Sequence, residues 1–130
     1  MRTSSLFLLV LMVACQKKKQ PDQAAAHAVH DLLIDRVFWK PVRVGGQSGR
    51  LVNQHQFAIT NTSSEHGYSQ ISIRFDYYDS TYHRVDSATY VFAQRIEPRS
   101  TVRIGAIQPG VTNPATKSAT VTVARAAIDD

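Results

Sequence analysis

The chain contains 130 residues, with a single cysteine and a formal net charge of +5 when histidine is neutral. This length is enough for one domain of ordinary size and an N-terminal extension. A lone thiol cannot form an internal disulfide, so the stability of the fold has to come from a hydrophobic core. Arg2 and the run Lys17-Lys18-Lys19 supply most of the excess charge. Without them the net charge is about +1, which gives no indication of nucleic-acid binding.

The N-terminus has the pattern of an export signal. Arg2 precedes an uninterrupted apolar run from Leu6 to Ala14, and Cys15 follows. This run is shorter than the roughly 20 residues that a helix needs to cross a bilayer. A basic start, an apolar centre and a small residue before the cut are typical of a signal peptide. We therefore expect residues 1–14 to be removed from the mature protein.

Residues Met12-Val13-Ala14-Cys15 resemble the lipobox of bacterial lipoproteins, in which an aliphatic residue, a small or aliphatic residue and Ala or Gly precede the cysteine. The resemblance implies that Cys15 carries a diacylglyceryl thioether and that its new amino group is acylated, as with palmitate. Two or three acyl chains would hold the protein firmly on a membrane of the cell envelope. By the same resemblance, Gln16 rather than Asp after the cysteine favours the outer membrane. The alternative is an ordinary secreted protein with an incidental cysteine.

Residues 15–32 are predicted to form the tether that joins the lipid to the folded domain. Residues 16–23 contain no apolar side chain and are typical of a flexible linker. The lysines within this linker either meet anionic lipid head groups or belong to a solvated spacer. The alanine-rich stretch that follows, with Asp22 as a candidate N-cap, predicts a short helix within residues 22–33.

From about residue 33 onward the apolar residues recur with period two, the pattern of half-buried strands. In residues 69–78, for example, Ile71, Ile73, Phe75 and Tyr77 alternate with polar residues. Turn-forming residues separate such stretches about every ten residues, and the last turn is expected at 109–114. The pattern predicts an all-β fold over residues 33–130, an antiparallel β-sandwich of about six or seven strands. The six clearest strands are residues 37–44, 51–60, 69–78, 85–93, 101–107 and 117–127.

Residues Phe75-Asp76-Tyr77-Tyr78-Asp79 resemble the Phe-x-Leu-Tyr-Asp signature of the FxLYD domain, a small immunoglobulin-like module of secreted and lipid-anchored prokaryotic proteins. Tyr77 stands where the family has Leu, and the glycine usual in the following turn is missing. The resemblance covers about residues 33–127. It implies an immunoglobulin-like sandwich exposed outside the cytoplasm, without catalytic activity.

The sequence shows no catalytic constellation, and we predict neither an enzyme nor a cofactor. The Gly-x-Ser-x-Gly turn of serine hydrolases is missing, and Cys15 would be acylated. His27, His30 and Asp31 would share a helix face at a spacing that suits a metal ion. Such short patterns recur by chance, so we predict no metal site.

A binding surface is the remaining candidate for function. Arg and Tyr are favoured at the centres of interfaces. We predict that Tyr78, Tyr82 and Arg74 belong to a basic and aromatic patch for a protein or glycan partner. A wider version of this patch would add Arg84, Arg99, Arg103 and Tyr90. The alternative is a set of isolated, solvated side chains on alternating strands.

Two functional hypotheses follow from these features. In the first, the chain is a membrane-anchored, non-catalytic binding or accessory module, with a protein partner in an envelope assembly and no role in nucleic-acid binding. In the second, it is an accessory domain that binds a carbohydrate or a small ligand beside an enzyme.

Overall fold

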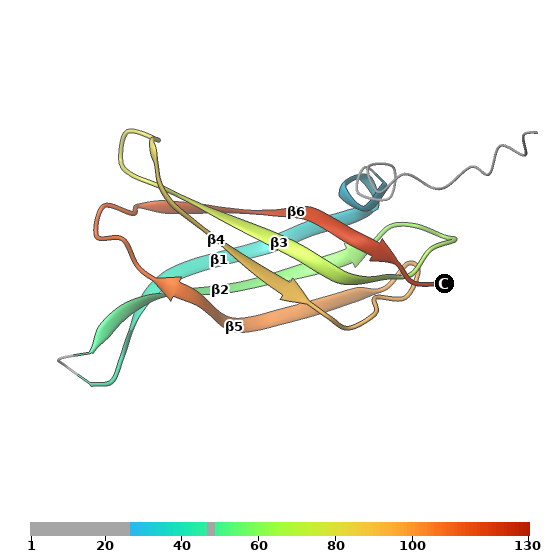
Figure 1. The fold of residues 1–130 in the computed structure, drawn as a ribbon, viewed down its shortest axis with the longest axis horizontal. Helices are drawn as coiled ribbons and strands as arrows, with labels where there is room; N and C mark the ends of the chain where they lie inside the picture. Colours follow the sequence, from blue (N-terminus) through green and yellow to red (C-terminus); the bar gives the residue numbers. More distant parts are fainter. Residues whose placement is uncertain (1–26, 47–48) are drawn as a thin grey trace, which may run out of the picture.

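The computed structural model describes residues 27–46 and 49–130. The predicted signal peptide, the predicted lipidation site at Cys15 and most of the predicted tether lie outside these residues. Six antiparallel strands form two sheets that pack face to face (Figure 1). They are β1 (Leu32–Val44), β2 (Arg50–Asn61), β3 (Tyr68–Tyr78), β4 (Arg84–Phe92), β5 (Thr101–Val111) and β6 (Ser118–Ile128). The predicted antiparallel β-sandwich is therefore confirmed.

The first sheet has the strand order β1-β2-β5, and the second sheet has the order β4-β3-β6. β1 pairs with β2 and β3 pairs with β4, whereas the other three connections cross from one sheet to the other. In the lettering of immunoglobulin domains, the two sheets correspond to strands A-B-E and C′-C-F. The sandwich thus has an immunoglobulin-like strand order, with β2 and β3 as the central strands.

All six predicted strands are present, but two of them are longer than predicted. β1 begins at Leu32 rather than at residue 37, directly after the helical residues 27–31, because Leu32 pairs with Asn61 and buries its side chain. β5 runs through Pro109 to Val111, where we expected a turn. β5 is an edge strand, and such a strand tolerates proline because the ring nitrogen can face away from the neighbouring strand.

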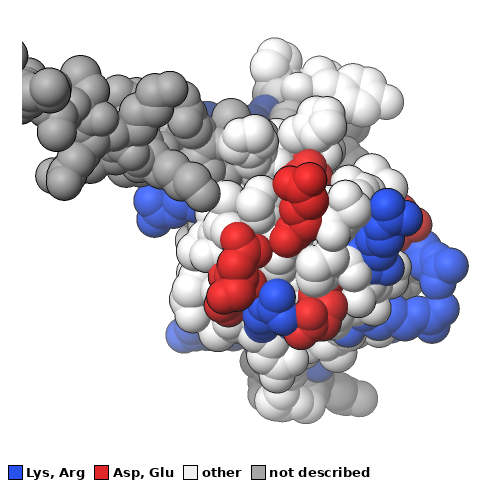
Figure 2. Space-filling view, turned by 90° about the vertical axis from the view of Figure 1, so that its right-hand side faces the viewer, with Lys and Arg blue, Asp and Glu red and all other residues white. Residues whose placement is uncertain are grey.

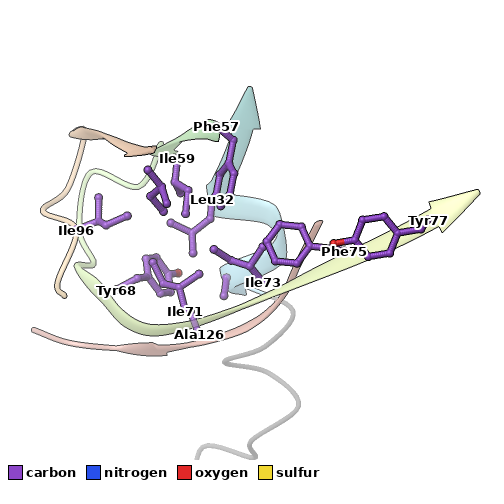
Figure 3. Packing of buried hydrophobic residues seen from close by; sticks show 12 residues of the cluster. Leu32, Phe57, Ile59, Tyr68, Ile71, Ile73, Phe75, Tyr77, Ile96 and Ala126 are labelled. Atoms are coloured by element: carbon purple, nitrogen blue, oxygen red, sulfur yellow. The ribbon is translucent and has the colours of Figure 1, made fainter. Parts of the chain in front are cut away.

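The core lies between the two central strands. Ile71, Ile73, Phe75 and Tyr77 alternate along β3 and are fully buried, as the period-two pattern predicts. Figure 3 shows these side chains on one side of the β3 ribbon, within a cluster that also includes Phe57 of β2. The rings of Phe57 and Phe75 meet edge to face at 6.1 Å. Full burial of side chains of this size stabilises a fold by about 1.5–3 kcal/mol each.

A polar and aromatic network crosses the core between the sheets. His55 on β2 is fully buried, and its Nε2 lies 2.8 Å from the hydroxyl of Tyr77 on β3. The imidazole also lies against the ring of Phe75, with centroids 4.1 Å apart. Nearby, the indole of Trp39 donates a hydrogen bond of 3.0 Å to Oδ1 of Asn53. Burial lowers the pKa of His55 to about 4, so the imidazole is neutral near pH 7.

The buried imidazole predicts a loss of stability in mild acid. The unfolded chain binds a proton at His55 near pH 6.5, whereas the folded chain binds one only near pH 4. Above pH 6.5 this group therefore has no effect on stability. As the pH is lowered from 6.5 to about 4, the free energy of unfolding should fall by about 3 kcal/mol from this group alone. Urea unfolding at a series of pH values measures this loss.

The double variant His55→Phe, Tyr77→Phe provides the control. It removes both partners of the hydrogen bond with little change in volume, so the fold should persist. Its free energy of unfolding should fall less than that of the wild type over the same pH range. Parallel pH curves for the two proteins would contradict the role assigned to His55.

Candidate binding site

The three residues predicted to bind a partner lie on the β3-β4 hairpin of the second sheet. Arg74 and Tyr78 share the outward face of β3, because they alternate with the buried Phe75 and Tyr77. Tyr82 lies in the turn between β3 and β4 and is 83% exposed. The structure therefore brings Arg74 and Tyr78 to one face and places Tyr82 at the end of the same hairpin.

The positive charge expected of this patch is largely neutralised. The carboxylate of Asp76 accepts hydrogen bonds of 3.0 and 3.2 Å from Nε of Arg74. It also lies 3.6 Å from Nη1 of Arg84. The wider set of residues does not form one surface, since Arg103 belongs to the first sheet and Tyr90 packs against the core. This hairpin therefore presents Tyr78 and Tyr82 beside paired arginines.

The turn that carries Tyr82 is fixed by Asp79. Its Oδ1 accepts hydrogen bonds from the backbone N–H groups of Thr81 and His83, at 2.9 and 3.0 Å. The hydroxyl of Thr81 donates a third, at 2.8 Å. These bonds, that from the His83 backbone above all, lower the pKa of Asp79. Asp79 is therefore the residue that forms the turn between β3 and β4.

The outward face of the first sheet carries a hollow with a volume of about 320 Å³, which we call the basic hollow. Its lining comes from all three strands of the sheet. It consists of Arg36 on β1, Gln56, Phe57 and Ala58 on β2, and Arg103, Ile104 and Gly105 on β5. Ala58 faces outward between the inward-facing Phe57 and Ile59, yet it is only 1% exposed. Longer side chains on the flanking strands rise around it, and Ala58 therefore forms part of the floor.

Two β-bulges shape the basic hollow. β1 has an extra residue at Arg36, opposite Phe57 of β2, and β5 has one at Ala106, opposite Gln56. Arg36 and Ala106 each have a φ of 52°, in the left-handed region. A residue other than glycine in this conformation costs about 1–2 kcal/mol. Bulges re-aim side chains and are over-represented beside functional sites.

Gly105 keeps one side of the basic hollow open. Its φ lies outside the left-handed region, because the unusual conformation falls on Ala106 instead. A Cβ atom at Gly105 would meet no atom within 4 Å. The backbone therefore does not require glycine at this position for a positive φ or for lack of space. A glycine within a strand often marks a place where a ligand approaches closely.

The charges around the basic hollow are not neutralised by ion pairs. Within residues 27–46 and 49–130, neither Arg36 nor Arg103 forms an ion pair. Asp35 and Arg103 both pair in register with Ala58, from opposite sides. The hollow is therefore surrounded by two cationic side chains, Arg36 and Arg103, and one anionic side chain, Asp35, which leaves a net positive charge. Phe38, the register partner of Gln56, is 52% exposed and adds an aromatic ring on the same face.

A third feature is the docking of the N-terminal segment on one end of the sandwich. The carbonyl oxygen of Asp31 accepts hydrogen bonds from the backbone N–H and the hydroxyl of Thr62, at 2.8 and 2.7 Å. Its carboxylate accepts a bond of 2.5 Å from the hydroxyl of Tyr68. Ala28, in the helical residues before it, is fully buried. The segment that follows the predicted tether is thus fixed to the loop after β2 and to the start of β3.

Opposing influences set the pKa values in this dock. Partial burial of Asp31 would raise its pKa, but the hydrogen bond from Tyr68 and the neighbouring His30 lower it below its ordinary value. Burial and the contact with Asp31 raise the pKa of Tyr68. The carboxylate and the neutral phenol are therefore the stable forms, and the charged acceptor strengthens the bond between them.

The described part of the chain contains no cluster of three or more His, Cys, Asp or Glu side chains placed to hold a metal ion. Asp31, which we considered with His27 and His30 as a metal-ligand pattern, is instead bonded to Tyr68. None of the helical residues in this part forms a helix long and apolar enough to cross a membrane.

Comparison with protein-family models, with curated proteins and with solved structures finds no match for this chain. Its function therefore has to be inferred from the residues themselves.

Replacing Tyr68 with Phe should loosen the dock without creating a cavity. The variant removes one hydrogen bond to a carboxylate, so the free energy of unfolding should fall by about 1.5–3 kcal/mol. The matched control is Tyr82→Phe at an exposed site, where a change within about 0.5 kcal/mol is expected. Chemical denaturation measures both values, and equal effects of the two substitutions would show that the dock adds nothing to stability.

Proposed function

We propose that the chain is a lipid-anchored, non-catalytic binding module of the bacterial cell envelope. Lipidation at Cys15 fixes the sandwich to a membrane, and its exposed surface binds a partner in an envelope assembly. The proposal rests on the lipobox-like sequence together with one structural observation, the dock at Asp31. Because this dock fixes the chain where the tether ends, the tether would hold the sandwich by the end at which Asp31 lies. We call this the held end.

The held end is distinguished by the segments that meet there and by its charged side chains. The helical residues 27–31, the loop after β2 and the C-terminus meet there (Figure 1). Acidic side chains are prominent on this end (Figure 2). They include Asp130, which pairs with His66, and Glu97, which pairs with Arg95. Because basic side chains on this end are paired with carboxylates, they attract anionic head groups weakly, which supports a sandwich that stands off the membrane on its tether.

The opposite end would then point away from the membrane. The β3-β4 turn with Tyr82 lies there, while the basic hollow lies along the flank of the first sheet. A partner on the same membrane would meet these surfaces at a high effective concentration, so weak contacts would be enough for binding. In this way a small sandwich on a membrane would act as an accessory module, by presenting its surfaces to a partner on the same membrane.

Binding of a small ligand is a second function, and the basic hollow is the observation that favours it. The hollow combines unpaired arginines and an amide, and the exposed ring of Phe38 lies on the same face. Few but well-placed polar groups in a concave site are typical of ligand-binding sites.

The lipid anchor has a direct test. In cells labelled with a fatty acid, the wild-type protein should carry the label and sediment with membranes, whereas Cys15→Ser should lose the label and leave the membrane fraction. Gln16→Ser is the matched control, since it changes the neighbouring residue and keeps the thiol. Membrane retention of Cys15→Ser equal to that of the wild type would refute the anchor.

The proposed orientation is tested by photo-crosslinking in intact cells. A photoreactive residue at Tyr82 should give a protein adduct of discrete mass that disappears when Cys15→Ser is added. The same residue at Glu65, on the end where the tether enters, should give no such adduct. Identical adducts from both positions would contradict a sandwich held by one end.

A further inference from the structure

We propose that the basic hollow binds a small ligand through an oxyanion, either a carboxylate or a phosphate group, held between Arg36 and Arg103. This inference deepens the second function proposed above and does not depend on lipidation of Cys15. Its failure would leave the anchored module intact, and failure of the anchor would leave the hollow intact.

The two arginines approach the hollow from opposite strands of the first sheet. Arg103 on β5 is the register partner of Ala58, which forms part of the floor. Arg36 reaches the hollow from the bulge in β1, on the other side of β2. A guanidinium group presents parallel N–H donors that match two oxygens of a carboxylate or phosphate. An oxyanion above Ala58 would therefore have a cationic donor on each side.

These arginines differ from those of the second sheet. There, Arg74 and Arg84 both form ion pairs with the carboxylate of Asp76, so each guanidinium already has a partner within the protein. Asp35 is the one carboxylate in the register row of Ala58 and Arg103, and it bonds to neither arginine of the hollow. The hollow thus keeps cationic groups available to a ligand, and one of them, Arg36, lies at a bulge position with an unusual backbone conformation.

The other groups indicate the size and character of the ligand. A volume of about 320 Å³ lies at the lower end of the range for small-molecule sites, which suits a group the size of one sugar or amino acid. The amide of Gln56 can both donate and accept hydrogen bonds. The missing side chain at Gly105 leaves room for close approach. A small polar acid fits these features.

The test is an NMR titration of the ¹⁵N-labelled full chain, purified in non-ionic detergent, with sodium phosphate and separately with sodium glutarate. Sodium chloride keeps the ionic strength constant. We expect saturable shifts of the Ala58 and Gly105 amides, with a Kd of about 1 mM. Arg36→Gln and Arg103→Gln should each weaken binding about tenfold, because each removes a charge-assisted contact. Asp35→Asn should strengthen binding, since it removes the opposing charge.

Two further variants separate the site from general effects of charge and folding. Arg84→Gln removes the same charge from the second sheet and should leave the affinity unchanged. Gly105→Val should fold, since its Cβ meets no atom within 4 Å, and it should abolish binding by filling the hollow. Binding of phosphate alone would support a phosphorylated ligand, and binding of glutarate alone would support a carboxylate. Absence of saturable binding to either, or binding unaffected by both Arg36→Gln and Arg103→Gln, would overturn the proposal.

Discussion

The contact between β2 and β3 across the sandwich is the constraint on which the other features depend. With no internal disulfide possible, the two sheets are held together mainly by packing, and the central strands provide most of it. His55 and Phe57 of β2 meet Phe75 of β3 with ring centroids 4.1 and 6.1 Å apart. The hydrogen bond between His55 and Tyr77 joins the two central strands across the core, where a buried polar group has to find a partner.

Because the central strands supply most of the core, the edge strands can be irregular. β1 and β5 flank β2 and contribute fewer fully buried side chains, so each can hold a bulge without breaking the core. The unusual backbone conformations of Arg36 and Ala106 both fall on these strands, opposite the same short stretch of β2. A central strand with a bulge on each side leaves its outward face locally uncovered. The basic hollow is therefore a consequence of where the core places its regular and irregular strands.

The sequence predicted the sandwich well because a buried strand leaves a period-two pattern, and β3 shows it in each residue from Ile71 to Tyr77. It predicted the turn at Asp79 because the chemistry of that turn is local. It could not predict the basic hollow, since Arg36 and Arg103 lie far apart in the chain and meet only through a register that the bulges displace. The neutralisation of Arg74 by Asp76 was visible as an i, i+2 spacing on one strand face. The bond between Asp31 and Tyr68 had no comparable signal, because it joins the end of the predicted tether to a strand start.

A membrane tether would compensate for weak binding in the basic hollow. A shallow hollow that presents two cations to solvent gains little from desolvation, so it would bind a free small anion only weakly. With a membrane anchor, the occupancy of the site depends on the local concentration of the ligand as well as on affinity, since ligands or partners on the same surface are encountered repeatedly. In the proposed module, the dock at Asp31 sets the end at which the chain enters the sandwich, while the hollow lies along its flank. A weak site that is kept near its ligand by the proposed anchor would therefore remain occupied without the deep, enclosed pocket that a soluble binding protein would need.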